Sequence, residues 1–297
     1  MSEYRLPVET HIGHVHLQVS DLERTLAFYG GLLGFQQAAR DGAKARLSAT
    51  GQAPYHVVLT ERSGAQRKPG GTTGLYHLAI RFLHRRALSR VFRRLVAHKW
   101  PFQGFADHLV SETLYLADPD GNGLELYVDR PREQWRRPNG QIEMATDLLD
   151  VESLLAEAEN DSMPWTGADP GTDIGHVHLH VSDLSQAEAF YSGLLGLDVT
   201  QRNYPGALFL SVGGYHHHLG VNVWAGVGAP PPPSDAVGLL SFGLVLPSEE
   251  AWQVLHTRLR ESGVGMEELP TDAQATNVLI HDPDGNGVEL LIERKIT

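Results

Sequence analysis

The fold of this chain is decided by one stretch of sequence that occurs twice. Residues 12–35 read IGHVHLQVSDLERTLAFYGGLLGF, and residues 174–197 read IGHVHLHVSDLSQAEAFYSGLLGL. A second matching pair follows, DPDGNGLEL at residues 118–126 and DPDGNGVEL at residues 282–290. The two offsets, 162 and 164 positions, are nearly equal. Two long matches at almost one offset indicate that the chain consists of two homologous halves.

The repeat predicts the domain organisation. We expect a first domain at residues 10–130 and a second at residues 172–295, joined by a linker at 131–171 that contains a helix near 151–158. Each half divides again, because alternating apolar residues that indicate a strand are followed twice by a helical pattern. We number the four strand–helix–strands units one to four; they start near His14, His77, His176 and Leu239.

Composition narrows the class of protein. The chain of 297 residues has material for about two domains. With 24 Lys and Arg against 36 Asp and Glu, its net charge of −12 argues against nucleic acid or an anionic membrane as a partner. The absence of cysteine excludes disulfides, thiolate catalysis and Cys-ligated metals. We see neither a signal peptide nor a long apolar run, so we expect a cytoplasmic enzyme.

Strand alternation places histidines on one face of the sheet. Residues i, i+2 and i+4 of a strand share a face, so the apolar residues of units one and three fall opposite polar ones. The polar residues are His14, His16 and Gln18 in unit one, and His176, His178 and His180 in unit three. After the first DPDGNG turn, Glu125 lies opposite Leu124 and Leu126. A solvated face usually carries Lys, Glu, Ser and Thr, so repeated His favours a lined cavity over a solvent-exposed face.

Histidines at strand starts and a glutamate after the turn predict a metal site. Two imidazoles and one carboxylate form the facial triad of non-haem divalent metals, which leaves positions open for substrate and dioxygen. A single strand histidine is more often packed or hydrogen-bonded than a ligand. Recurrence of the pattern favours the metal.

At this point the sequence resembles the vicinal-oxygen-chelate superfamily, and within it the catechol-2,3-dioxygenase-like proteins. The most specific match is HLVSETLYLADPDGNGLE at residues 108–125, which resembles the extradiol dioxygenase pattern of His, Tyr, Asp-Pro-x-Gly and Glu. The resemblance covers almost the whole chain. It implies an α+β fold of four βαβββ modules paired into two cupped mixed-sheet barrels.

The resemblance also implies a ligand set. His77 and Glu125 occupy two ligand positions of the family pattern. The third ligand depends on which units pair. Crossed pairing of units two and three gives His176, which we favour because unit three is richer in histidine; sequential pairing of units one and two gives His14.

Further residues take catalytic roles by the same resemblance. His217, in the run Tyr215–His218, is expected as the acid–base because it shares the parity of Leu219 and Val221. His216 and His218 are alternatives, as is His56 under sequential pairing, and the run could instead be a surface metal-binding patch. His108 and Tyr115 are expected to hydrogen-bond a substrate oxygen.

Unit four departs from the pattern. Ser241 stands where unit two has His77, and Leu279 stands where unit two has Tyr115. Glu289 therefore lacks its usual companions, and we expect a site that depends on unit four to hold no metal.

The sequence thus predicts a metal-dependent extradiol ring-cleaving dioxygenase, an oxidoreductase that degrades a small catechol-like aromatic with O2. Fe(II) is the expected metal, with Mn(II) as the alternative, and a homo-oligomer is compatible with the family. Rival hypotheses are a hydroquinone-type dioxygenase, a glyoxalase-type lyase or isomerase, and a metal-free binding protein. The lyase chemistry usually needs a second Glu ligand where this chain offers His56 or His216–His218.

Overall fold

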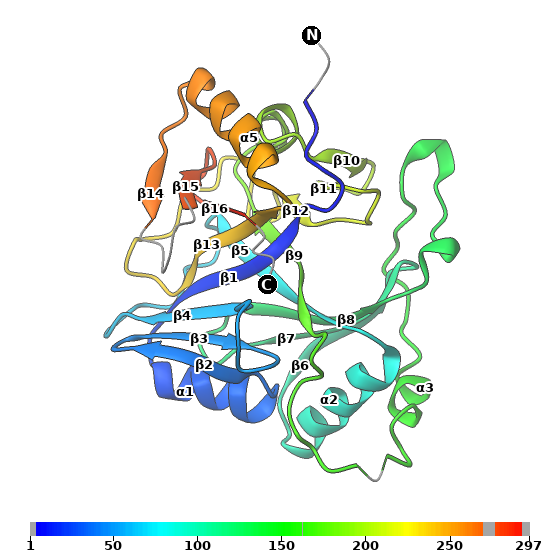
Figure 1. Ribbon diagram of the computed structural model, residues 1–297. Coiled ribbons are helices and arrows are strands. Elements are labelled where there is room, and N and C mark those ends of the chain that lie inside the picture. Colours follow the sequence, from blue (N-terminus) through cyan, green and yellow to red (C-terminus); the bar gives the residue numbers. More distant parts are fainter. Residues whose placement is uncertain (1–3, 162, 270–276, 293–297) are drawn as a thin grey trace.

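The protein contains two eight-stranded mixed sheets (Figure 1). The computed structural model describes residues 4–161, 163–269 and 277–292. The first sheet has the spatial order β14 (Glu267–Leu269), β15 (Asn277–His281), β16 (Gly287–Ile292), β13 (Gly238–Leu246), β1 (His11–Val19), β4 (Val57–Glu61), β3 (Lys44–Ser48) and β2 (Gln36–Asp41). The second has the order β10 (Asp198–Gln201), β11 (Ala207–Ser211), β12 (Leu219–Asn222), β9 (Asp173–His180), β5 (Gly74–Phe82), β8 (Gly123–Asp129), β7 (Ser111–Ala117) and β6 (Phe102–Asp107).

Each sheet combines one unit from each half of the chain. β1 pairs antiparallel with β13, which joins units one and four, and β5 pairs antiparallel with β9, which joins units two and three. In Figure 1 the blue strands accordingly lie with the orange and red ones. The crossed pairing that we favoured is therefore the observed one. The expected domains, residues 10–130 and 172–295, are homologous sequence halves, and the two sheets cut across them.

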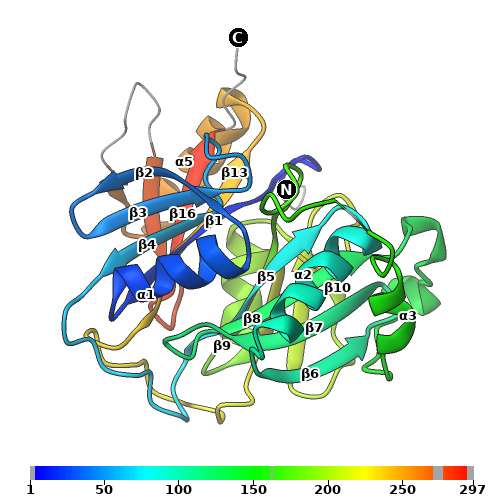
Figure 2. The same cartoon turned by 90° about the horizontal axis from the view of Figure 1, so that it is seen from below.

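The helices cover one face of each sheet and confirm the α+β class. α1 (Leu22–Leu26) and α4 (Leu184–Glu188) each begin after an aspartate N-cap and continue as π-helical turns, Ala27–Leu32 and Ala189–Leu194. The longer helices are α2 (Arg85–Ala97) and α5 (Glu249–Ser262). Figure 2 shows α1 against the first sheet and α2 against the second. None of the helices within the described ranges is long and apolar enough to cross a membrane.

Alternation assigns the two faces as expected. Val177, Leu179 and Val181 are fully buried in the apolar core beneath the helices. The opposite face, called the inner face below, carries the histidines of the same strand. His176 and His178 are 0% and 3% exposed, so this face is not a solvated surface.

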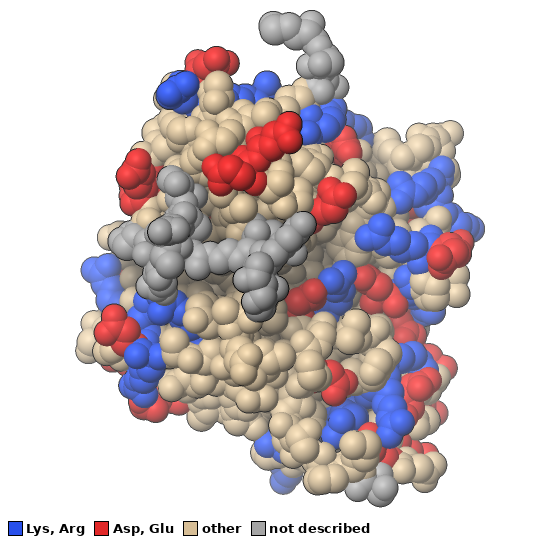
Figure 3. All heavy atoms as spheres, in the orientation of Figure 1, with Lys and Arg blue, Asp and Glu red and all other residues tan. Residues whose placement is uncertain are grey.

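The linker between the two halves packs on α2. It contains two short 3-10 turns (Arg132–Gln134 and Pro138–Gly140) and the helix α3 (Val151–Ala156), which confirms the helix expected near this position. Arginines of α2 pair with linker carboxylates, Arg85 with Glu157 and Arg86 with Asp161. In Figure 3, blue and red side chains accordingly lie side by side over α2 and α3.

Candidate metal centre

Three adjacent strands of the second sheet bring His77, Glu125 and His176 together. Glu125 of β8 and His176 of β9 both pair in register with Ala79 of β5, the strand between them. His77 lies two residues before Ala79 and therefore projects from the same face. The small side chain of Ala79, fully buried, leaves the space between its larger neighbours open.

The three side chains approach within metal-binding distances. His77 Nε2 lies 3.1 Å and His176 Nε2 3.3 Å from Glu125 Oε2. One ligand atom from each residue lies within 4.8 Å of both others, and all three residues are buried. Within the described part of the chain, this is the only such group of three His, Cys, Asp or Glu residues.

The electrostatics of the cluster favour an ionised Glu125 carboxylate beside a neutral His176 imidazole. Burial by itself would raise the pKa of Glu125, but His176 and His77 more than offset it and hold this pKa well below its ordinary value. Burial lowers the pKa of His176 to about 4, although Glu125 opposes the shift. A neutral imidazole and an ionised carboxylate are the forms that bind a divalent cation.

The donor geometry fits a metal better than a hydrogen-bonded cluster. His77 Nε2 is buried and has no hydrogen-bond partner, even though Glu125 Oε2 is 3.1 Å away. An unpaired buried nitrogen of this kind is costly, and a cation between the three ligand atoms would satisfy it. The other carboxylate oxygen, Oε1, accepts a hydrogen bond of 3.0 Å from Thr113 Oγ1, which fixes the carboxylate.

His108 and Tyr115 form a hydrogen-bonded pair next to this cluster. His108 Nδ1 lies 2.6 Å from the carbonyl oxygen of Ala145, which can only accept, so Nδ1 carries the proton. His108 Nε2 therefore accepts from the hydroxyl of Tyr115 at 2.7 Å. The ring of Tyr115 lies 5.7 Å from that of His77. Both nitrogens of His108 are engaged within the protein, so the Tyr115 oxygen is the atom of this pair that remains for a ligand.

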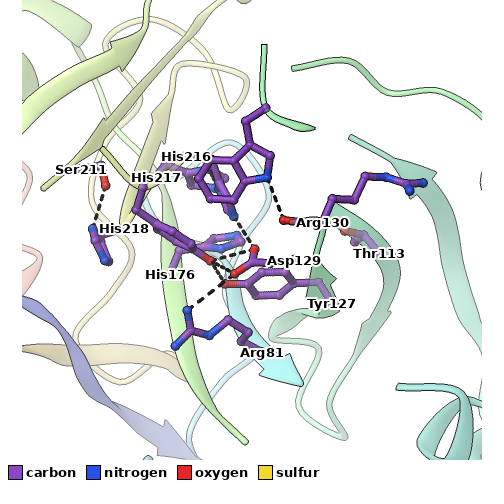
Figure 4. Close-up of polar contacts among 12 residues, drawn as sticks. Arg81, Thr113, Tyr127, Asp129, Arg130, His176, Ser211, His216, His217 and His218 are labelled. Carbon is purple, nitrogen blue, oxygen red and sulfur yellow. Dashed lines mark hydrogen bonds and ion pairs between the residues drawn. The ribbon is translucent and has the colours of Figure 1, made fainter. Parts of the chain in front are cut away.

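His217 lies against the cluster, but not for the reason that alternation suggests. Its ring centroid is 4.0 Å from that of His176, which lies beside it in Figure 4. The ring of Phe209 lies 4.9 Å from that of His217. His217 precedes β12 rather than belonging to it. Leu219 and Val221 lie on the apolar face beneath the helices, because they pair in register with Val177 and Leu179. The argument from shared parity is therefore wrong, although the residue does lie at the cluster.

The neighbouring histidines of the run point elsewhere. His216 bonds Asp129 and His217, and the Nδ1 of His218 lies 2.8 Å from Ser211 Oγ. The run is buried, with His216 and His217 at 1% and 8% exposure, so the hypothesis of a surface metal-binding patch is wrong.

An aromatic group adjoins the cluster on the other side. The ring of His178 lies 5.0 Å from His77, 5.2 Å from Tyr76 and 5.5 Å from Trp224. Tyr76 and Trp224 are 39% and 45% exposed, so this group connects the buried cluster with solvent. His178 Nε2 is buried and has no hydrogen-bond partner.

The first sheet contains a reduced counterpart of the cluster. His14 Nε2 lies 3.2 Å from Glu289 Oε2, and Ser241 Oγ donates to Glu289 Oε1 in place of an imidazole. Burial by itself would raise the pKa of Glu289, but contact with His14 lowers it to about 2. His14 and His56, both of unit one, thus lie with the first sheet, which units one and four form, and not at the His77 cluster. This removes the two residues that sequential pairing would have used.

Sequence reasoning missed several residues of the second sheet. Thr113 bonds Glu125, the ring of Tyr127 lies 5.0 Å from that of His176, and Asp129 bonds His216 beside the cluster. A signal for Thr113 was present, because it lies two residues before Tyr115 on one strand face. The pairing of Asp129 with His216 carried no such signal, since the two residues are far apart in the chain.

Comparison with known proteins agrees with this fold. The model of the Glyoxalase/Bleomycin resistance protein/Dioxygenase superfamily matches residues 11–126 and 173–290. A catechol-2,3-dioxygenase of Bacillus subtilis (strain 168) is 45% identical over 271 residues, which cover 88% of this chain and 91% of the relative. The biphenyl-2,3-diol 1,2-dioxygenase 3 of Rhodococcus globerulus is 27% identical over 42% of this chain and 65% of its own length.

Solved structures share the fold at low sequence identity. A Bacillus subtilis protein described as a candidate dioxygenase superposes with a TM-score of 0.70 and 11% identity, over 98% of this chain and 87% of that one. Glyoxalase I from Zea mays superposes with a TM-score of 0.56 and 18% identity, over 96% and 92%. The chain therefore belongs to the glyoxalase/bleomycin resistance/dioxygenase superfamily, as its sequence pattern indicates.

Proposed function

We propose that this protein is a metal-dependent extradiol dioxygenase that cleaves the ring of a catechol-like aromatic. The observation that carries the proposal is the meeting of His77, Glu125 and His176 within 4.8 Å on the inner face of one sheet. The 45% identical catechol-2,3-dioxygenase supports the same enzyme class, an oxidoreductase that incorporates dioxygen.

We assign His77, Glu125 and His176 as the ligands of the metal, with Fe(II) as the preferred ion and Mn(II) as the alternative. Bound there, the metal would act as a Lewis acid that lowers the pKa of a catechol hydroxyl and orients the reactants. Thr113 holds the Glu125 carboxylate in place through its hydrogen bond. The neutral imidazole of His176 makes this ligand available without displacing a proton near neutral pH.

The neighbouring side chains are assigned to proton transfer and to substrate orientation. His217, in ring contact with His176, accepts the proton of a catechol hydroxyl and later returns it. Tyr115 contacts a substrate oxygen through its own oxygen, because its proton is donated to His108. His108 thus acts through Tyr115 and not by touching the substrate. The exposed rings of Tyr76 and Trp224 stack on the aromatic substrate at the entrance.

The test is anaerobic reconstitution of the purified protein with Fe(II) or Mn(II), followed by catechols, hydroquinones and dioxygen. We expect dioxygen uptake and a yellow ring-fission product from a catechol, and none from the glutathione hemithioacetal of methylglyoxal. Isomerisation of the hemithioacetal, or cleavage of hydroquinones alone, would replace the proposal with a rival hypothesis. Tight binding of catechols with no turnover in any metal form would favour a binding protein.

A further inference from the structure

A chain of hydrogen bonds runs from His217 away from the metal centre. His217 Nδ1 lies 2.8 Å from His216 Nδ1, and His216 Nε2 lies 2.9 Å from Asp129 Oδ1. Asp129 is the last residue of β8, and the two histidines precede β12. The contact between His216 and Asp129 is drawn as a dashed line in Figure 4. These residues come together only because units two and three pair in one sheet.

The carboxylate end determines the direction of the chain. Burial by itself would raise the pKa of Asp129, but the hydrogen bond from His216 more than offsets it, and this pKa lies below its ordinary value. The ionised carboxylate can only accept hydrogen bonds. It accepts from the Tyr215 hydroxyl at 3.0 Å and lies 3.6 Å from a guanidinium nitrogen of Arg81. His216 Nε2 must therefore carry a proton.

The direction at Asp129 propagates to His217. When His216 is neutral it has one N–H, so a proton on its Nε2 leaves its Nδ1 as an acceptor. His217 Nδ1 must then be the donor across the 2.8 Å contact. The Nε2 of His217 is left with a lone pair, and it has no hydrogen-bond partner among the described residues. This nitrogen lies on the side of the ring away from His216.

We propose that Asp129 and His216 are positioning residues that fix His217 in the tautomer with its proton on Nδ1 and its lone pair on Nε2. This inference rests on the proposed function, in which His217 is the base. The substrate O–H bond breaks as the new N–H bond forms at Nε2, and the proton stays on the His217 imidazolium. Asp129 takes up no proton; its negative charge stabilises the cation through His216, as in other carboxylate–histidine arrangements.

The chain of hydrogen bonds ends at His217 Nε2, which has no partner among the described residues. This free end distinguishes the chain from an ordinary buried polar cluster. Tyr127 and Tyr215 also share this region, with their hydroxyl oxygens 2.8 Å apart, and Tyr215 donates to the same carboxylate. Neither tyrosine lies on the path from Asp129 to His217. Removing the Tyr215 hydroxyl therefore takes away one hydrogen bond to Asp129 and leaves the chain of imidazoles intact, which provides a matched control.

The first experiment observes the tautomer itself. Protein labelled with ¹⁵N-histidine is studied without metal and with diamagnetic Zn(II), and the His217 signals are assigned with a His217→Gln variant. We expect Nδ1 of His217 to be protonated and Nε2 to be unprotonated in the wild type. A wild-type His217 protonated on Nε2 would overturn the inference. Because the wild type itself is observed, the result does not depend on whether an Asp129 or His216 variant folds.

The second experiment replaces the carboxylate that sets the direction of the hydrogen bonds. In Asp129→Asn the amide can donate to His216 Nε2, so the opposite tautomer becomes available and we expect His217 to populate it. Tyr215→Phe should keep the wild-type tautomer. An unchanged tautomer in Asp129→Asn, or an equal change in both variants, would contradict a positioning role for Asp129.

Kinetics then separate the inference from the proposed function. In Fe(II)-loaded protein, Asp129→Asn should lower kcat by about tenfold to a hundredfold while metal occupancy and KM stay close to wild type. Tyr215→Phe should retain most of the activity. If the wild type cleaves no catechol, the proposed function fails while the spectra still decide the tautomer. If catechols are cleaved but His217 has the opposite tautomer, only the inference fails.

Discussion

The hydroxyl oxygen of Tyr127 occupies the space beside the backbone of Gly175. A Cβ atom added at Gly175 would lie 1.7 Å from this oxygen and 3.2 Å from the Cβ of Arg81. Gly175 directly precedes His176, and the ring of Tyr127 lies 5.0 Å from that of His176. Close approach of β9 to Tyr127 thus depends on the missing side chain, and it positions a proposed metal ligand.

Gly175→Ala should therefore displace Tyr127 or the strand and weaken metal binding together with stability. We expect a loss of about 1–3 kcal/mol in the free energy of unfolding, typical of overpacking. The matched control is Gly13→Ala, which precedes His14 in the first sheet and would bring a Cβ to 2.5 Å from Val245 Cγ2. Both should destabilise the fold in urea titrations, but only Gly175→Ala should weaken metal binding in calorimetry. Equal metal affinity in the two variants would contradict the assignment of His176.

Glu125→Gln should abolish metal retention. The neutral amide removes the negative charge of the ligand set and leaves two buried imidazoles. We therefore expect the bound metal to fall from about one ion per chain to near zero after gel filtration. Glu289→Gln alters the equivalent carboxylate of the first sheet and should leave the stoichiometry unchanged. Metal analysis by mass spectrometry measures both. Full occupancy in Glu125→Gln would end the proposal for this site.

Ser241→His should create a second metal site in the first sheet. Ser241 stands at the position of His77, and Glu289 and His14 already lie 3.2 Å apart. We expect the stoichiometry to rise from about one to about two ions per chain. Adding Glu289→Gln to this variant should return it to one. If Ser241→His still binds one ion, the two sheets differ by more than one ligand, for example by Leu279 in place of Tyr115.

The free energy of unfolding should decrease as the pH is lowered, because buried histidines resist protonation. Burial and the nearby Lys44 lower the pKa of His16 from 6.5 to about 4. Between these values the unfolded chain binds a proton that the folded chain does not, so stability is lost as the pH falls from 6.5 towards 4. We expect His16→Gln to reduce this loss by about 2 kcal/mol.

Urea unfolding of the metal-free protein at about pH 7 and about pH 4.5 measures the effect. His11→Gln, an exposed substitution on the same strand, serves as the control and should leave the dependence of the wild type unchanged. A His16→Gln variant with the full wild-type loss would show that this imidazole is not responsible.

The sequence predicts the parts of this molecule that have a short-range signal. Period-two alternation identifies β1, β5 and β9, and the duplicated DPDGNG turn locates β8 with Glu125. The edge strand β2 escapes prediction, because QQAARD is mostly exposed and has no apolar face. β6 is likewise an edge strand with a glycine at its centre.

The remaining part of the site depends on contacts between distant segments. His77 and Glu125 follow from one unit, whereas His176 joins them only through the antiparallel pairing of β5 with β9. Histidine density favours that pairing but does not determine it. The position of His217 depends on a loop conformation, for which strand parity gives the wrong reason. Asp129 becomes relevant only when His216 lies 2.9 Å away.

The strands of one sheet lie in sequence between the two groups of strands that form the other, which has a consequence for the growing polypeptide. Every strand of the sheet that carries His77, Glu125 and His176 comes from the continuous stretch 74–222. The other sheet joins β1–β4 to β13–β16, which are synthesised after that stretch. Because ribosomes add only about 5–20 residues per second, unit one spends many seconds without its partner. The sheet with the candidate metal centre can therefore be assembled during translation, while β1 pairs with β13 only after all the strands of that sheet have been synthesised.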